Sequence, residues 1–325
     1  MGYNYGYLWG KNNVVWDANQ WIADFSKEDA DFRDMRKAVF ATTVKAVQEN
    51  GYLVKTGEKG NQFVKVDLEF SPDVCEKTKF YFIKTFPIPN IYHDITEYKV
   101  LKKDCLLVAK ELVDSNFGKV AVLNMASRQN PGGGVATGAG AQEEYLFRCS
   151  DYYHSLYQFV DYGWKYNVPR KMYSYPLDRN FGGVFSPNIT VFRGPEEDGY
   201  PFLENPWKIN FIAVPGLRNP EILIDENQQI TLPPILMDAL RNKIRTILNI
   251  AIDNHITILV LSALGCGAFH NPPYVVASLF KEILQENLYR NAFAKVYFAI
   301  KPDHNSCDID LAGIFSEVFS DLLVL

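Results

Sequence analysis

The sequence predicts an α/β protein with a mostly parallel sheet that is covered by helices on both faces. Three observations support this fold class. Strand-like apolar runs alternate with helical patterns through the second half of the chain. The runs at 118–126 and 256–263 are nearly continuous in apolar residues, as in strands buried on both faces, and a glycine-rich loop follows each of them. Alternating strands and helices build a sheet of this kind.

The composition is that of a folded chain without a strong charge. The chain has 325 residues, of which 47% are hydrophobic and 14% aromatic, and this excludes a disordered protein. The net charge of −5 gives no overall attraction to nucleic acid or to an anionic membrane. No segment approaches the ~20 apolar residues of a membrane span, and we see no signal peptide. We expect a cytoplasmic protein without a membrane partner, and there is no direct evidence for nucleic-acid binding.

The five cysteines favour a reduced protein. No pair has the C-x-x-C spacing of a zinc or redox motif, and an odd count argues against a disulfide framework. They are Cys75, Cys105, Cys149, Cys266 and Cys307.

The first half of the chain contains few regular elements. Residues 1–25 are aromatic and rich in Asn, with no clear period. Apolar residues at helical spacing predict a helix over 29–50, which Gly51 ends. Two strands are expected at 63–69 and 78–84, followed by a helix at 104–114.

The second half carries the alternating pattern. The expected elements, in order, are strands at 118–126 and 207–214, a helix at 234–253, a strand at 256–263, a helix at 273–288, a strand at 294–300 and a helix at 308–322. The intervening region, 151–206, is rich in Tyr, Pro and Asn, and is expected to form a long, partly irregular insertion, for which a structural turn at 181–185 is one alternative.

Two glycine loops are the first candidates for a ligand site. Open α/β sheets bind ligands beyond the carboxyl ends of their strands, where the loops 130–144 and 264–271 follow buried strands. Glycine lets the backbone approach a ligand and turn its N–H groups inward, so the pair is suited to hold both ends of a diphosphate. The alternative is that the loops serve only as tight turns.

Known phosphate fingerprints fit these loops poorly. The sequence has no G-x-x-x-x-G-K-[ST] motif, which disfavours a P-loop nucleotide hydrolase. The loop 264–271 lacks the third glycine of G-x-G-x-x-G, and no acidic residue follows at the expected distance. A nicotinamide-dependent enzyme is therefore disfavoured.

Two adjacent carboxylates, Glu143 and Glu144, follow the first glycine loop. Carboxylates repel a polyphosphate, so an anion site that keeps them suggests proton transfer. The alternative is that they simply open a helix, whose dipole favours acidic residues in its first turn. Adjacent helical positions point about 100° apart, so we expect one to act as acid/base and the other to position.

These residues complete a specific signature. Gly132, Gly133 and Gly134, seven intervening residues, and then Gln142-Glu143-Glu144 match the GGG-x(6–8)-QEE pattern of poly(ADP-ribose) glycohydrolases. Together with the segments 175–193 and 259–280, they resemble the microbial-type branch of that family over about residues 30–302. The resemblance implies a macrodomain fold, a three-layer α/β/α mixed sheet with an N-terminal helical accessory segment. It divides the chain into an extension of unknown role (1–28) and a glycohydrolase-like domain (29–325).

The resemblance also implies roles for individual residues. Glu144 is the expected catalytic acid/base, Glu143 fixes the ribose, and Gln142 helps to set the loop. Residues expected to bind substrate are Asn130, Gly132, Gly133, Gly134 and Val135 in the first loop, and Gly265, Cys266, Gly267, Ala268 and Phe269 in the second. The chain departs from the family at His270, where Gly is usual, and this bears on substrate choice.

The implied reaction is hydrolysis of ribose-linked O-glycosidic bonds in poly(ADP-ribose), with release of ADP-ribose. Alternatives are a mono-ADP-ribosyl hydrolase acting on modified protein or nucleic acid, and a non-catalytic ADP-ribose reader, against which the intact QEE triplet argues. No metal or cofactor is expected, because the five histidines show no ligand spacing.

Arg128 and Arg148 flank the first loop, either to pair phosphates or, as we favour, to make structural ion pairs. Packing is likewise the favoured role of four aromatic residues, Tyr152, Tyr153, Tyr157 and Phe159.

Overall fold

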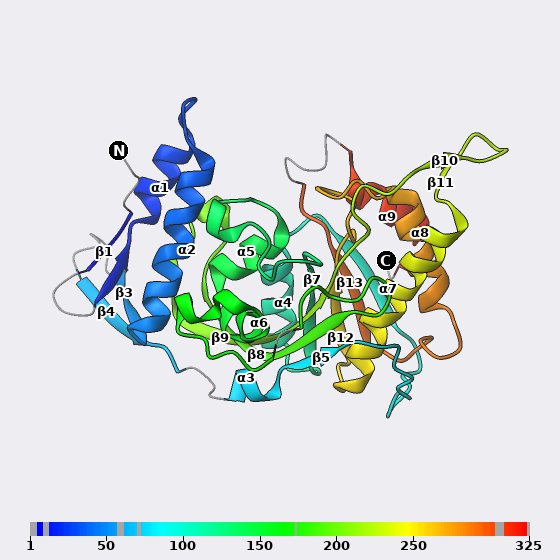
Figure 1. Ribbon diagram of the computed structural model, residues 1–325, viewed down its shortest axis with the longest axis horizontal. Helices are drawn as coiled ribbons and strands as arrows, with labels where there is room; N and C mark the ends of the chain where they lie inside the picture. The colour runs from blue at the N-terminus through cyan, green and yellow to red at the C-terminus, as the bar shows by residue number, and fades with distance from the viewer. Residues whose placement is uncertain are drawn as a thin grey trace. The chain divides into compact units, whose positions relative to one another are not determined.

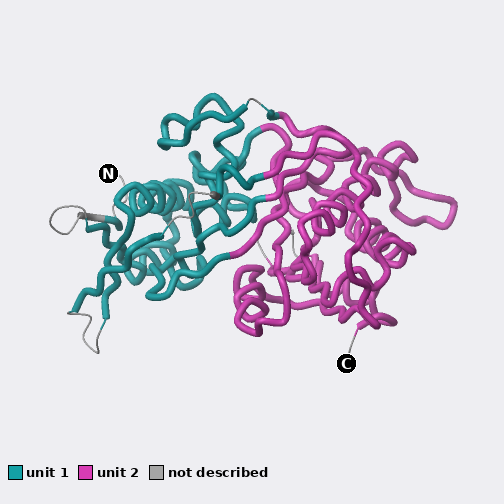
Figure 2. The backbone as a smooth tube through the Cα atoms, turned by 90° about the horizontal axis from the view of Figure 1, so that it is seen from below, with its two compact units in different colours: residues 1–78, 130–175, 186–208 teal, residues 79–129, 176–185, 209–325 magenta. Residues whose placement is uncertain are grey.

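The computed structural model describes residues 5–8, 13–56, 62–69, 73–172, 174–302 and 309–323. It contains two compact units, each assembled from separate stretches of chain (Figure 2). Unit 1 comprises residues 1–78, 130–175 and 186–208, and unit 2 comprises 79–129, 176–185 and 209–325. Cys307 and one of the five histidines, His304, lie outside the described residues.

A seven-stranded mixed sheet organises unit 2 (Figure 1). Its order is β5-β8-β9-β7-β12-β13-β6, and β8 and β9 also run on into unit 1. The pairs β9–β7, β7–β12, β12–β13 and β13–β6 are parallel, whereas β5 and β8 pair antiparallel. The strands are β5 (Lys79–Tyr81), β6 (Glu97–Leu101), β7 (Val120–Met125), β8 (Gly183–Arg193), β9 (Phe202–Val214), β12 (Ile258–Leu261) and β13 (Lys295–Ala299). The predicted mostly parallel sheet is confirmed.

Helices cover both faces of this sheet. Alternate residues of β7, β12 and β13, such as Leu123, Leu261 and Phe298, share one buried core with α7 (Pro234–Asp253), α8 (Pro273–Leu284) and α9 (Leu311–Val318). The alternate side chains of the same strands point to the other face, where α4 (Cys105–Asp114) contacts β7 and β12. The three-layer α/β/α arrangement is therefore present. A short hairpin, β10 (Leu223–Ile224) with β11 (Ile230–Thr231), precedes α7.

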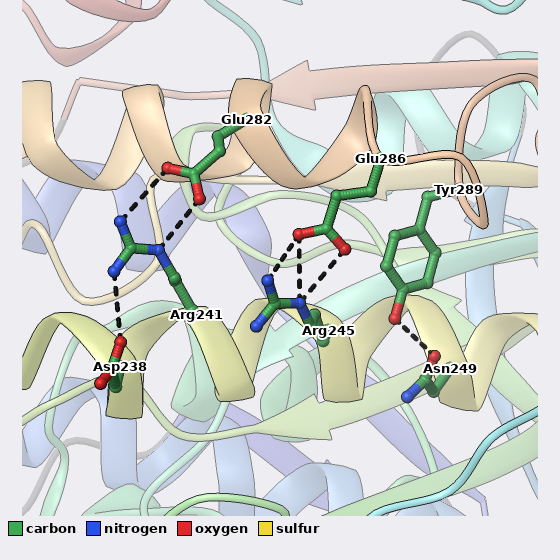
Figure 3. Close-up of polar contacts among 7 residues, drawn as sticks. All are labelled: Asp238, Arg241, Arg245, Asn249, Glu282, Glu286 and Tyr289. Carbon is green, nitrogen blue, oxygen red and sulfur yellow. Dashed lines mark hydrogen bonds and ion pairs between the residues drawn. The ribbon is translucent and has the colours of Figure 1, made fainter.

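A polar ladder joins α7 to the end of α8 and the turn that follows it (Figure 3). The guanidinium of Arg241 pairs with Glu282 at 3.0 Å, and that of Arg245 pairs with Glu286 at 2.5 Å. The partners advance in the same direction along both segments, so α7 and α8 run parallel, as two helices that precede neighbouring parallel strands must. Because these ion pairs are substantially exposed, they fix the register of α7 against α8 more than they stabilise the fold.

The structure also contains strands that the sequence patterns did not reveal. β8 runs through the region expected to be irregular, and Gly183 to Phe185 begin this strand instead of making a turn. Pro187 and Asn188 conceal it, since proline cannot donate to a ladder and Asn188 adopts a φ of +54°. The edge strand β6 was missed because four of its five residues are half-exposed and two of them, Glu97 and Lys99, are charged.

Unit 1 contains the long helix α2 (Phe32–Gln48), which confirms the helix expected over 29–50. Asp31 caps it by accepting from the N–H groups of Arg33 and Asp34. The hairpin of β3 (Gly51–Thr56) and β4 (Gln62–Asp67) follows, and only its second strand was expected. In the described ranges of this unit, the remaining elements are β1 (Gly6–Leu8), β2 (Val14–Trp16), α1 (Ala18–Phe25), α3 (Asp73–Lys77), α5 (Gln142–Cys149) and α6 (Tyr153–Leu156), together with the short 3-10 turns η1 (Val135–Thr137), η2 (Tyr157–Phe159), η3 (Asp161–Tyr166) and η4 (Glu196–Asp198).

A carboxyl group, that of Asp151, is fully buried in unit 1 just after α5. Its Oδ1 accepts a 2.8 Å hydrogen bond from the Thr190 N–H. Burial raises the pKa of Asp151 to about 7, although the bonds from Thr190 act in the opposite direction. The folded chain therefore holds a proton on this residue that the unfolded chain releases at much lower pH.

This difference predicts a pH dependence of stability. Between about pH 4 and about pH 7, Asp151 is ionised in the unfolded chain but stays protonated in the folded chain. The contribution of Asp151 to the free energy of unfolding therefore falls as the pH rises. We expect Asp151→Asn to remove this loss. The free energy of unfolding of the variant, measured relative to that of the native chain, should therefore be about 2–4 kcal/mol higher at pH 8 than at pH 5. Urea denaturation at both pH values measures the difference, with the exposed Asp161→Asn as control. Equal pH dependence in Asp151→Asn and the native chain would contradict the assignment.

Candidate active site

The first glycine loop belongs to unit 1 and is tightly wound. The N–H of Gly133 donates to the Asn130 carbonyl at 2.9 Å, and that of Val135 donates to the Gly132 carbonyl at 3.0 Å. Gly132 and Gly133 have φ values of +77° and +55°, which favour glycine. This conformation leaves the neighbouring N–H groups of Gly132 and Gly134 free to bind outside the turn.

Those two N–H groups hold the two carboxylates of α5. Gly132 N donates to Glu143 Oε1 at 3.0 Å, and Gly134 N donates to Glu144 Oε1 at 2.8 Å. Both glutamates are buried in the first turn of the helix, where the positive end of the helix dipole also stabilises negative charge. A helix does begin at Gln142, as the alternative interpretation of the two glutamates has it, and each carboxylate accepts from a different amide.

The two carboxylates differ in what remains unbound. Oε2 of Glu144 is buried and makes no hydrogen bond with any described residue. A buried polar oxygen without a partner costs free energy, so its retention calls for an explanation beyond folding. One oxygen of Glu144 is thus fixed by the loop, while the other is available for proton transfer.

The backbone of Gly133 lies directly against Glu144. A Cβ atom at Gly133 would lie 2.2 Å from Glu144 Oε1 and 3.3 Å from Glu143 Oε2. No side chain fits there without moving a carboxylate. Gly132 is similarly confined, because its Cβ would lie 2.7 Å from the Phe147 ring.

A set of buried and half-buried charged residues, Arg36, Arg148 and Glu196, supports the loop, and sequence reasoning did not find most of it. Arg36 on α2 donates to both oxygens of Glu196, at 2.8 and 3.1 Å, and its guanidinium packs against Gly140. Burial alone would raise the pKa of Glu196, but the bond from Arg36 and the charges of Arg148 and Arg36 bring it below the usual value. The two partners are 160 residues apart, so no local pattern could have revealed the pair.

The second glycine loop belongs to unit 2. Gly265 has a φ of +71°, and the Asn271 side-chain amide donates to the Leu217 and Gly265 carbonyls at 2.6 and 3.0 Å. His270 also has positive φ, +54°, in a conformation that suits glycine. Burial raises the pKa of the Cys266 thiol, which leaves its backbone, not its sulfur, as the group suited to bind a ligand.

The predicted site residues are therefore divided between the two units. Unit 1 brings together the first-loop residues Asn130, Gly132, Gly133, Gly134 and Val135 with Gln142, Glu143 and Glu144. Unit 2 holds Gly265, Cys266, Gly267, Ala268 and Phe269. That both loops hold one diphosphate stays a prediction.

The flanking residues have structural partners. Arg148 is buried and bonds to Ala139 and Tyr200, whereas Arg128 donates to the Leu177 carbonyl at 3.1 Å. The aromatic cluster is buried, with Phe147 packed on Tyr152 and Tyr157 at centroid distances of 4.9 and 5.6 Å. The burial of the aromatic cluster agrees with the packing role favoured from the sequence. Arg148 also forms the favoured ion pair, 3.8 Å from Glu196, whereas the contact of Arg128 is to a carbonyl and not to a carboxylate.

Two kinds of feature are absent from the described part of the chain. It contains no group of three or more His, Cys, Asp or Glu side chains placed to hold a metal ion. None of the helices in the described ranges is long and apolar enough to cross a membrane.

Comparisons with known proteins find one matching family model and several similar structures. Residues 41–194 match the family described as microbial-type PARG, catalytic domain, where PARG denotes poly(ADP-ribose) glycohydrolase. No curated protein matches the chain. The structure is similar to that of poly(ADP-ribose) glycohydrolase from Thermomonospora curvata, with 25% identity, a TM-score of 0.64 and coverage of 88% of this chain and 100% of that chain.

Two ligand-bound structures are also similar. The T. curvata enzyme bound to the inhibitor ADP-HPD is 26% identical, with a TM-score of 0.64, over 88% of this chain and 99% of that one. The enzyme from Deinococcus radiodurans in complex with ADP-ribose is 28% identical, with a TM-score of 0.58, over 77% of this chain and 96% of that one.

The crowding at Gly133 predicts the outcome of a small substitution. Gly133→Ala places a methyl group on Glu144 Oε1 and forces a positive φ on a residue that resists it, which costs about 1–2 kcal/mol for the backbone alone. We expect a lower unfolding temperature and, in a crystal structure of the variant, a Glu144 carboxylate displaced from Gly134 N. The control is Gly267→Ala, whose φ is not positive and which should change stability by less than about 0.5 kcal/mol. A fully stable Gly133→Ala with the bond intact would refute the interpretation.

Proposed function

We propose that this chain, in which residues 41–194 match the model of the microbial-type PARG catalytic domain, hydrolyses the ribose-linked O-glycosidic bonds of poly(ADP-ribose) and releases ADP-ribose. The observation that carries the proposal is the pair of buried carboxylates bound to the glycine-loop amides, with Glu144 Oε2 left unpaired. A binding module gains nothing from this arrangement, because an unpaired carboxylate repels an anionic ligand.

Glu144 is proposed as the general acid and base. As an acid it gives its proton to the leaving oxygen while the bond from that oxygen to the ribose C1″ breaks, through an oxocarbenium-like state. The resulting carboxylate then takes a proton from the water that attacks C1″, which restores the acid. The bond from Gly134 N holds Oε1, so that Oε2 is the oxygen proposed to exchange the proton.

Glu143 is proposed to position the reacting ribose. Its Oε1 is bound to Gly132 N, and the α5 backbone turns the Glu143 side chain about 100° away from that of Glu144. Negative charge on Glu143 also raises the pKa of nearby Tyr162, where burial is the larger cause, to about 12. The Tyr162 hydroxyl therefore stays protonated beside the site. Asn130, Gly132 to Val135 and Gly265 to Phe269 are proposed to bind the rest of ADP-ribose.

The function is tested by supplying two substrates to the native protein and to Glu144→Gln. We expect ADP-ribose release from purified poly(ADP-ribose), and a fall of about 10²–10⁴-fold in Glu144→Gln, because an amide cannot exchange the proton. ADP-ribose affinity, measured by calorimetry, should change less than about tenfold. The exposed Glu204→Gln serves as a control that keeps full activity.

Three outcomes would contradict parts of this proposal. Release only from mono-ADP-ribosylated protein would reassign the substrate. Binding of ADP-ribose without any release would make the protein a reader. Full activity in Glu144→Gln would remove Glu144 from the reaction.

A further inference from the structure

A single buried guanidinium, that of Arg148, connects the glycine loop to the turn between β8 and β9. Arg148 lies in the last turn of α5 and is 1% exposed. Its Nη1 donates to the Ala139 carbonyl at 2.7 Å, and its Nε donates to the Tyr200 hydroxyl at 2.8 Å. Ala139 lies between the three glycines of the loop and the glutamates of α5. The Arg148 side chain therefore fixes the backbone that joins the three glycines to the two glutamates.

The Tyr200 hydroxyl has a fixed orientation. Burial raises its pKa well above the ordinary value, so it keeps its proton. It donates that proton to Glu196 and accepts from Arg148 Nε. The hydroxyl thus uses its donor and one acceptor site at the same time, and it aligns Arg148 toward the loop.

The N-terminal segment packs on the other side of Tyr200. The Trp21 ring is fully buried and makes an edge contact with the Tyr200 ring at a centroid distance of 5.4 Å. The Trp16 indole N–H donates to the Gly199 carbonyl at 2.7 Å. At Gly199, where φ is +77°, a Cβ atom would lie 2.4 Å from the Ala18 carbonyl oxygen. Residues 16–21 therefore lie directly against Gly199 and Tyr200.

We propose that Arg148 and Tyr200 are positioning residues for the reaction, and that residues 16–21 act on the active site by holding Tyr200. The inference rests on the function proposed above and adds a role for the N-terminal segment. Loss of either bond frees the Ala139 backbone, so that the amides of Gly132 and Gly134 no longer hold the carboxylates in place. Small displacements of catalytic groups lower kcat strongly.

The chemistry of Arg148 favours positioning over simple packing. A buried ion pair adds little net stability, because desolvation opposes the attraction, and the Glu196 carboxylate is 3.8 Å from Arg148 Nη2. What a guanidinium supplies is a rigid fork that reaches two acceptors at once. A lysine has a single terminal nitrogen and cannot reproduce this geometry.

The test compares two Tyr→Phe variants in the full chain. Tyr200→Phe keeps the ring and its contact with Trp21 but loses the hydroxyl. We expect kcat on poly(ADP-ribose) to fall about 10- to 100-fold while KM changes less than about threefold. The matched control is Tyr52→Phe, which removes a hydroxyl that donates to the Leu203 carbonyl at 2.6 Å and should lower the unfolding temperature without changing kcat. Arg148→Lys should behave like Tyr200→Phe.

Hydrogen–deuterium exchange of residues 130–141 gives a readout that does not depend on catalysis. We expect faster exchange in Tyr200→Phe and Arg148→Lys than in the native chain or in Tyr52→Phe. If both variants keep native kcat and native exchange, the positioning role is refuted. If the native protein releases no ADP-ribose, the proposed function fails, and the exchange rates alone then decide whether Arg148 and Tyr200 hold the loop.

Discussion

The hydrogen bond from Gly134 N to Glu144 Oε1 is the constraint on which the candidate site depends. Two carboxylates at adjacent positions repel each other and lose solvation when buried, so both need compensation. The loop supplies one amide to each, and the N-terminus of α5 adds its dipole. Because a single oxygen of Glu144 is held this way, the other has a fixed direction without a partner of its own. A rigid carboxylate with one free oxygen is what proton transfer to a bound substrate requires.

The glycines make this arrangement possible for reasons of space as well as conformation. Gly133 cannot carry a side chain while Glu144 stays in place, because a Cβ atom there would lie 2.2 Å from the carboxylate oxygen of Glu144. Its positive φ turns the chain so that the amides on either side face α5. The support then extends outward through Arg148 and Tyr200 to the N-terminal segment. A loop rich in glycine has little rigidity of its own, so packed side chains around it must supply the rigidity.

The sequence predicted the parts of this site that are local in the chain. The glycine run, the helix that starts at Gln142 and the adjacent glutamates are all visible within about fifteen residues, and the parallel sheet follows from its apolar strands. What it could not predict depends on contacts between distant residues. The pairing of Arg36 with Glu196 has no periodicity to reveal it. The strand β8 was hidden by Pro187 and Asn188, whose usual preference for turns is overridden by pairing within the sheet.

The role given to Glu144 can be measured most directly with a substrate that needs neither an acid nor a base. In an O-aryl glycoside of ADP-ribose made from a strongly acidic phenol, the phenolate leaves without taking up a proton. Azide attacks C1″ without having to lose a proton. We predict that Glu144→Gln, nearly inactive on poly(ADP-ribose), cleaves this glycoside in azide at a rate within about tenfold of the native enzyme, with the azide adduct as product. If the variant is as defective on the aryl glycoside with azide as on the polymer, Glu144 does not act by proton transfer, and the account of the site is wrong.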